Sequence, residues 1–184
     1  MRSISKFLLA LLVGLTGVLA AVSPAQAAST PESLGGLDLG AYCRSIGYSD
    51  ATLTGSTAYD WHCVSGDGAL ADLTFEAACQ WAYSTSEAVD RIGDFTDPTS
   101  AGCWRVTATV VTPDFENYCT STGHSASILV GTTVYDWQCV SYSRAGPTYY
   151  AISLPTVCAY TTGTTATIDR FVNYYDATTW QCRV

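Results

Sequence analysis

The chain of 184 residues contains 16 Asp and Glu against 8 Lys and Arg, and its formal net charge is −8 at pH 7. A surface of that sign repels phosphate groups, which excludes nucleic acids and anionic membranes as expected partners. The chain has eight cysteines and no Cys-x-x-Cys, and an even number of cysteines favours disulfides over metal or redox thiols.

The first 27 residues have the pattern of a signal peptide. Arg2 and Lys6 make a basic start, an apolar run covers 7–22, and Ala25 and Ala27 are the small residues that a signal peptidase needs. The run of 16 residues is short for the ~20 that span a bilayer. We therefore expect cleavage after residue 27. The product would be a secreted, extracellular protein with no membrane anchor and a net charge of −10.

An internal repeat organises the rest of the chain. With a shift of 76 residues, 42–65 aligns with 118–141 at 14 identities in 24 positions, including Tyr-Asp-Trp-x-Cys in both copies. The repeat predicts a flexible lead, a first module, an extended joint and a second module, over 28–36, 37–106, 107–111 and 112–184. His62 and His124 are not at equivalent positions, so no zinc site is repeated, and we expect neither a metal nor another cofactor.

Each module begins with a β-rich region. In the first, Ala51–Thr54 and Thr57–Val64 flank Gly55-Ser56, a break typical of a β-hairpin. Side chains alternate between the two faces of a strand. Four aromatic residues therefore share a face with a cysteine and are predicted to lie in the core: Tyr59, Trp61, Tyr135 and Trp137.

Helical patterns follow the β-rich region. Apolar residues recur at helical spacing between Asp72 and Tyr83, which predicts an amphipathic helix with Asp72 or Thr74 as its cap. A second short helix is predicted over 86–92. The second module repeats this order with a longer loop over 141–150. The expected fold class is α+β, with two tandem disulfide-stapled modules, each a β-hairpin or small antiparallel sheet with one or two short helices.

The spacing of the cysteines favours one pairing. The first two cysteines of each module are 20 residues apart and the last two are 24 apart, whereas the middle interval differs between the modules. Pairing first with second and third with fourth fits this, although four cysteines allow three pairings. Each disulfide would contribute on the order of 3 kcal/mol to a small core. The structural cysteines are Cys43, Cys63, Cys79, Cys103, Cys119, Cys139, Cys158 and Cys182.

Several polar positions are duplicated. We interpret the pairs Asp90-Arg91 and Asp169-Arg170 as local charge pairs or helix caps, and Asp97 and Asp176 as side-chain turns. Neither histidine is duplicated and no Gly-x-Ser-x-Gly occurs, so no catalytic residue is assigned. An enzyme would need a site between the modules, using unduplicated groups such as His62, Glu76 or Glu87.

Aromatic residues suggest a sugar-binding surface. Trp61 and Trp137 could stack on pyranose rings while Asp60 and Asp136 bind hydroxyl groups, although Asp60 and Trp61 face opposite sides of a strand. The alternative is that both tryptophans pack on the disulfides. Surface candidates are found in the longer loop of the second module, which could instead contact the first: Tyr142, Tyr149 and Tyr150.

The segments Tyr42-Cys43, Tyr59–Cys63, Ala77–Tyr83 and Asp97-Pro98 before Cys103-Trp104 form an ordered pattern. This pattern resembles small two-disulfide modules of exported actinobacterial proteins. In those modules an Ala-Cys-x-x-x-Tyr helix precedes a Trp-x-Cys ending, which the second copy keeps and the first does not. The resemblance implies an exported, stapled module and no particular activity.

These observations lead to three functional hypotheses. The first is a monomeric, non-enzymatic secreted binding protein whose ligand is an extracellular polysaccharide or a protein, because two weak sites on one chain raise avidity. The second is an inhibitor or effector of an extracellular enzyme, acting through 141–150. The third is a small secreted enzyme with an intermodule site.

Overall fold

A computed structural model describes residues 30–184, so the signal-peptide prediction lies outside the described residues. The fold is α+β, with four α-helices, small antiparallel sheets and four disulfides. The N-terminal half contains β1 (Glu32–Gly35), α1 (Leu39–Ser45), β2 (Asp50–Leu53), β3 (Trp61–Val64), β4 (Leu70–Asp72), α2 (Phe75–Tyr83), β5 (Ala88–Ile92) and β6 (Ala101–Arg105).

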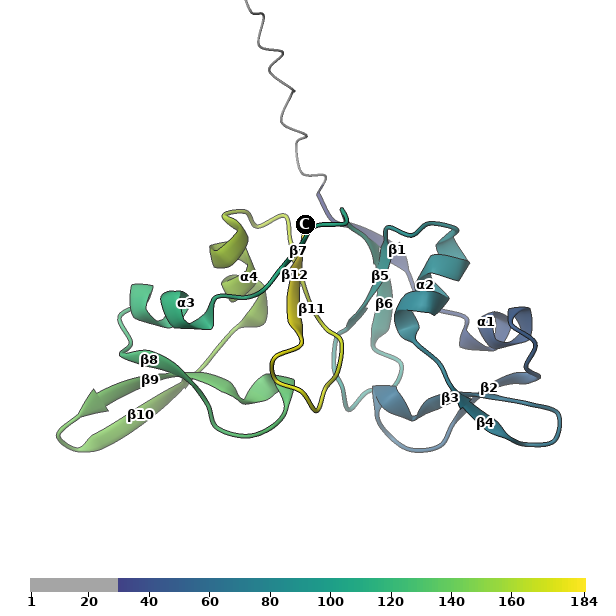
Figure 1. Cartoon of the computed structure of the whole chain (residues 1–184), viewed down its shortest axis with the longest axis horizontal. Coiled ribbons are helices and arrows are strands. Elements are labelled where there is room, and N and C mark those ends of the chain that lie inside the picture. Colours follow the sequence, from purple (N-terminus) through teal and green to yellow (C-terminus); the bar gives the residue numbers. More distant parts are fainter. Residues whose placement is uncertain (1–29) are drawn as a thin grey trace, which may run out of the picture.

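The C-terminal half contains elements in the same order: β7 (Val110–Val111), α3 (Phe115–Ser121), β8 (Ala126–Leu129), β9 (Trp137–Ser143), β10 (Gly146–Ala151), α4 (Leu154–Thr162), β11 (Ile168–Phe171) and β12 (Trp180–Arg183). Figure 1 shows the halves side by side, with β5, β6, β11 and β12 at the centre and the β2–β4 and β8–β10 sheets at the outer ends. Each half thus presents an outer sheet, a central sheet and two helices.

Each disulfide joins a helix to the middle strand of a three-stranded sheet. In the N-terminal half, Cys43–Cys63 joins α1 to β3, and Cys79–Cys103 joins α2 to β6. Cys119–Cys139 and Cys158–Cys182 make the same connections in the C-terminal half. This is the pairing that the spacing favours, and four disulfides indicate an oxidising compartment. Within 30–184, no helix has the length and apolar character needed to cross a membrane.

The segments that precede each repeat contain strands. Glu32–Gly35, expected to be a flexible lead, is β1 and pairs with β6. Val110–Val111, expected to be part of a joint, is β7 and pairs with β12. The Thr107 amide donates to the Val184 carbonyl oxygen at 2.6 Å. At Glu32–Gly35 the lead is a strand and not flexible, whereas the strand at Val110–Val111 is itself extended. The central sheet of each half takes its third strand from the segment that precedes the repeat.

Two other assignments change. The 86–92 segment, predicted to be helical, contains strand β5, which pairs with β6 over all five of its residues. The predicted loop over 141–150 is instead mostly strand, because β9 and β10 form a regular antiparallel hairpin. The helix predicted over 72–83 is confirmed as α2, with Thr74 as its N-cap, although the Thr74 side chain makes no capping hydrogen bond.

Tyr59 and Tyr135 lie in short 3-10 helices that precede β3 and β9, so the alternation predicted for them is wrong. The Asp60 carboxylate accepts hydrogen bonds from the Thr57 amide and hydroxyl, both at 2.8 Å. Asp136 binds the equivalent Thr133 groups. A Cβ on Gly55 or Gly131 would lie 2.4 Å from these carboxylates, so both positions require glycine.

The hydrogen bonds to Asp60 and Asp136 predict that the stability of the fold decreases in acid. Hydrogen bonds from the threonine backbone amides lower the pKa of Asp60 and Asp136 below 3.8. A lowered carboxyl pKa contributes stability above the unfolded pKa, and that stability is lost as the pH falls through the folded pKa. The double variant Asp60→Asn, Asp136→Asn should therefore lose less of its thermal midpoint between about pH 5 and pH 2 than the unmodified protein. Parallel midpoint curves, measured by circular dichroism, would contradict this.

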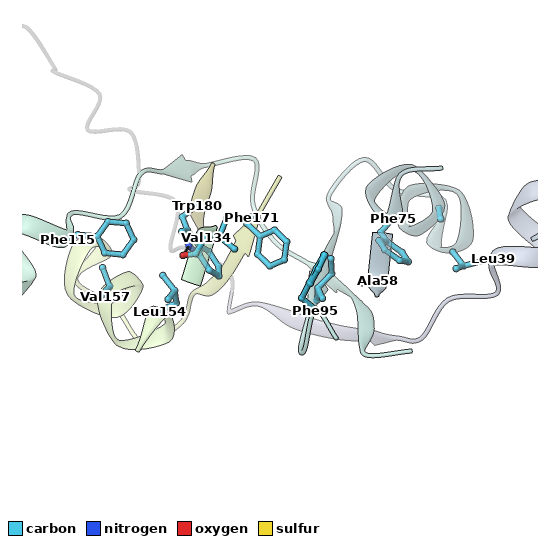
Figure 2. Close-up of a cluster of buried hydrophobic side chains, with 12 residues drawn as sticks. Leu39, Ala58, Phe75, Phe95, Phe115, Val134, Leu154, Val157, Phe171 and Trp180 are labelled. Carbon is cyan, nitrogen blue, oxygen red and sulfur yellow. Dashed lines mark hydrogen bonds between the residues drawn. The ribbon is translucent and has the colours of Figure 1, made fainter. Parts of the chain in front are cut away.

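The hydrophobic core is continuous across both halves. One cluster of buried residues extends from Leu39 and Phe75 through Phe95 and Phe171 to Phe115, and Figure 2 shows Phe95 and Phe171 between the flanking groups. The core therefore depends on contacts between the halves as well as within each.

Aromatic side chains from the two halves pack against each other at the centre of the molecule. Phe95 stacks on Tyr174 with ring centroids 3.5 Å apart, and these two residues occupy equivalent positions in the halves. The Tyr59 hydroxyl donates to the Val172 carbonyl and accepts from the Tyr174 amide. Tyr135 remains 44% exposed, and its assignment to the core is wrong. Within the described residues, the Tyr135 hydroxyl makes no hydrogen bonds equivalent to the two that the Tyr59 hydroxyl makes to the other half.

Candidate functional site

Equivalent grooves lie beside Trp61 and Trp137. The first groove has a volume of about 540 Å³ and the second about 440 Å³. Each is bounded by the start of a helix, by two strands of the outer sheet and by the loop before the last strand of its half. Matching residues in the two linings include Asp38 and Asp114, Leu39 and Phe115, Ala51 and Ser127, and Thr99 and Thr178.

The tryptophan of each groove is held by its polar edge. Trp61 Nε1–H donates to the Pro98 carbonyl at 2.8 Å, and Trp137 Nε1–H donates to the Ala177 carbonyl at 2.7 Å. Both rings are partly buried and pack against the core. Phe115 stacks on Trp137 with centroids 4.7 Å apart. The two indoles therefore combine the predicted core packing with a place in a groove wall.

Besides the equivalent Asp38 and Asp114, each groove has a second carboxylate, and non-equivalent residues supply it. Glu116 Oε2 accepts from the Ser127 amide at 2.7 Å, and Asp50 Oδ1 accepts from the equivalent Ala51 amide at 2.9 Å. Gly40 stands at the position of Glu116, and a Cβ there would lie 2.4 Å from Asp50 Oδ1. The two carboxylates thus bind equivalent backbone amides in the two grooves. A residue-by-residue comparison of the repeats misses this substitution.

The two grooves differ in charge. In the first, Arg44 Nη1 lies 3.0 Å from Asp50 Oδ1. In the second, the position of Arg44 is taken by Thr120, whose hydroxyl donates to the Glu116 carbonyl. The Glu116 carboxylate therefore has no arginine at the position that neutralises Asp50.

Sequence candidates Asp60 and Asp136 do not share the grooves with the tryptophans. Their carboxylates serve the 3-10 turns, and neither residue is part of a groove lining. Asp97 and Asp176 form the predicted side-chain turns, each accepting from the amide and hydroxyl of a threonine two residues later.

A third cavity lies between the halves, and the Asp90–Arg170 ion pair in its lining has a reciprocal counterpart outside it. Arg170 Nε and Nη2 contact Asp90 Oδ1 at 3.1 and 2.8 Å. Arg91 makes the same two contacts to Asp169 Oδ1 at 3.1 and 3.0 Å. The interpretation of these positions as local charge pairs or caps is wrong, because each arginine pairs with the other half. Strands β5 and β11 pack against each other there.

The cavity between the halves has a volume of about 570 Å³. Arg170 Nη2 also contacts Glu76 Oε2 at 2.9 Å, so a second carboxylate adjoins the buried pair. Burial raises the pKa of the Asp90 carboxyl, and the Arg170 charge opposes that rise. The lining contains Tyr59, Trp61, Asp72, Phe75, Glu76, Gln80, Asp90, Ile92, Arg170, Phe171 and Val172.

The tyrosines proposed from sequence lie on the β9–β10 hairpin and are exposed. Tyr149 lies opposite Val140 in the ladder, which puts it on the same face as Tyr142. Tyr150 lies opposite Cys139 on the other face, where its ring packs on His124 at 4.4 Å between centroids. The structure therefore brings two of the three tyrosines onto one surface.

His62 does not line the cavity between the halves. Its Nδ1 lies 3.3 Å from Asp72 Oδ1, but the pair lacks hydrogen-bond alignment. Glu76 lines the cavity and Glu87 does not. Across 30–184, no cluster of three or more His, Cys, Asp or Glu residues is arranged to hold a metal ion.

Comparison with known proteins finds no match among family models, curated proteins or solved structures.

Proposed function

We propose that the protein is a secreted, non-enzymatic binding protein made of two tandem copies of one module. Each copy binds sugar units of an extracellular polysaccharide in its tryptophan groove. The observation that carries the proposal is the carboxylate beside a held indole ring in both grooves, supplied by Glu116 in one and Asp50 in the other.

The chemistry of the grooves suits a sugar. An aromatic ring offers apolar surface to the C–H face of a pyranose, and a few fixed polar groups orient the ligand. Carboxylate oxygens accept hydrogen bonds from hydroxyl groups, and such charge-assisted bonds are stronger than neutral ones. Asp50 and Glu116 are exposed. Asp50 uses Oδ1 for the Ala51 amide and Arg44, and Glu116 uses Oε2 for the Ser127 amide and hydroxyl, so the other oxygen of each carboxylate is open to a ligand.

Two grooves on one chain favour a polymeric ligand. Once one groove is occupied, the second binds at a high effective concentration, which can raise avidity by about 10²–10⁴ over a single site. A repeating polysaccharide offers the same unit to both grooves, so no second ligand is required.

Binding to insoluble cell-wall polysaccharide and to a glycan array tests the proposal. The variants Asp50→Asn and Glu116→Gln should each weaken retention by about tenfold or more, and the double variant should abolish it, because avidity needs both sites. Glu87→Gln removes one exposed negative charge outside the grooves and should be retained like the unmodified protein. Absence of retention by the unmodified protein, or equal retention of all variants, would refute the proposal.

A protein ligand is the second candidate, and the β9–β10 hairpin favours it. Tyr142 and Tyr149 are 64% and 49% exposed on one face, and tyrosine is enriched in protein interfaces. The same hairpin would carry the inhibitor or effector alternative. A double Tyr142→Ser, Tyr149→Ser variant that keeps polysaccharide binding but loses inhibition of a secreted protease or lysozyme would support that alternative.

A further inference from the structure

We propose that the cavity between the halves binds one small organic cation, with its charged group near Glu76 and Asp72 and its apolar part against the aromatic walls. This site differs from the tryptophan grooves in its place between the halves and in its stoichiometry, although Trp61 and Phe75 also line the first groove.

The charges of the cavity favour a cation. Three carboxylates line it, from Asp72, Glu76 and Asp90, against one guanidinium from Arg170. The Arg170 side chain is already engaged, with Nε and Nη2 on Asp90, Nη2 on Glu76, and Nη1 3.3 Å from the Gln181 amide oxygen. The guanidinium therefore has few donors left for an anionic ligand, while the cavity keeps an excess of two negative charges.

The apolar walls suit the body of such a ligand. The rings of Tyr59, Phe75 and Phe171 line the cavity together with Trp61, and Tyr59 and Phe171 are adjacent, with centroids 6.4 Å apart. The electron-rich faces of aromatic rings attract ammonium groups, most strongly when water is excluded. Glu76 is partly exposed and Asp72 fully exposed, so carboxylates lie at the cavity entrance as well as at its base.

The site should occur once per chain. In the C-terminal half, the positions of Glu76 and Gln80 are taken by Pro155 and Ala159. The reciprocal ion pair of Arg91 and Asp169 therefore lacks the carboxylate that adjoins Arg170. The arrangement of two carboxylates on one arginine is thus not repeated at the Arg91 pair within the described residues.

Calorimetric titration with choline and with its neutral isostere 3,3-dimethylbutan-1-ol tests the inference on the full secreted chain. We expect choline to bind with a stoichiometry of one, and the neutral alcohol to bind at least about tenfold more weakly, because it lacks the charge. Glu76→Gln keeps the shape of the side chain and should weaken choline binding by about tenfold, whereas Glu87→Gln should not change it.

Val172→Lys gives an independent check, because Val172 lines the cavity and is exposed. A lysine there should prevent choline binding without removing a core contact. Equal binding of choline and the alcohol, unchanged binding by Glu76→Gln and Val172→Lys, or no binding of choline at millimolar concentration would overturn the inference. Loss of polysaccharide retention alone would not, since that tests the grooves.

Discussion

Replacing Arg170 by methionine is expected to lower the free energy of unfolding by about 3–5 kcal/mol, because it leaves the buried Asp90 carboxylate without its partner. Arg170 is 7% exposed and contacts both Asp90 and Glu76. Urea unfolding followed by tryptophan fluorescence, with the disulfides intact, measures the change.

The matched control is Arg44→Met, which breaks the exposed pair with Asp50. Exposed ion pairs contribute about 0–1 kcal/mol, so this variant should be nearly as stable as the unmodified protein. A further variant, Arg170→Met with Asp90→Leu and Glu76→Gln, should recover part of the loss, because buried ion pairs can be replaced by apolar groups at little cost. Equal stabilities of Arg170→Met and Arg44→Met would contradict the role of the pair between the halves.

Removing the Cys79–Cys103 disulfide with two alanine substitutions is expected to cost about 3 kcal/mol. Both cysteines are fully buried, and the bond fastens α2 to β6 beside the core that the halves share. Because Phe95 and Phe171 belong to one cluster, the loss should lower the unfolding temperature of both halves together in a single calorimetric transition.

The control is removal of a disulfide far from the shared core, the outer Cys43–Cys63 bond, which joins α1 to β3 away from the central strands. Hydrogen exchange should show that its removal loosens the outer sheet of the N-terminal half more than β11. Two separate transitions in the Cys79→Ala, Cys103→Ala variant, with the C-terminal half unchanged, would contradict a shared cooperative core.

Local patterns in the sequence predicted local features well. Helix α2 follows from apolar spacing, the turns at Asp97 and Asp176 follow from short polar side chains, and the repeated intervals of 20 and 24 residues favour the disulfide pairing that the structure has. Each of these features depends on residues close in sequence or on a distance that the repeat preserves.

Features that depend on distant partners could not be predicted in this way. Arg170 and Asp90 are 80 residues apart, and their positions look like local pairs because each Asp precedes an Arg. Strand β5 was predicted to be helical, since a fully buried strand lacks the alternation that marks an exposed one. The groove carboxylates could not be predicted, because Asp50 and Glu116 are not aligned in the sequence repeat. They are related by the equivalent backbone amides that they bind.

The most direct test of polysaccharide binding in the two grooves follows the indole N–H resonances of the five tryptophans in a ¹⁵N-labelled sample. Soluble oligosaccharides released from cell walls are added stepwise. The Nε1–H groups of Trp61 and Trp137 bond to the loops that border the grooves. Both resonances should shift and saturate together, while Trp81, exposed on α2, should not move. Unchanged Trp61 and Trp137 resonances throughout the titration would contradict polysaccharide binding in the two grooves.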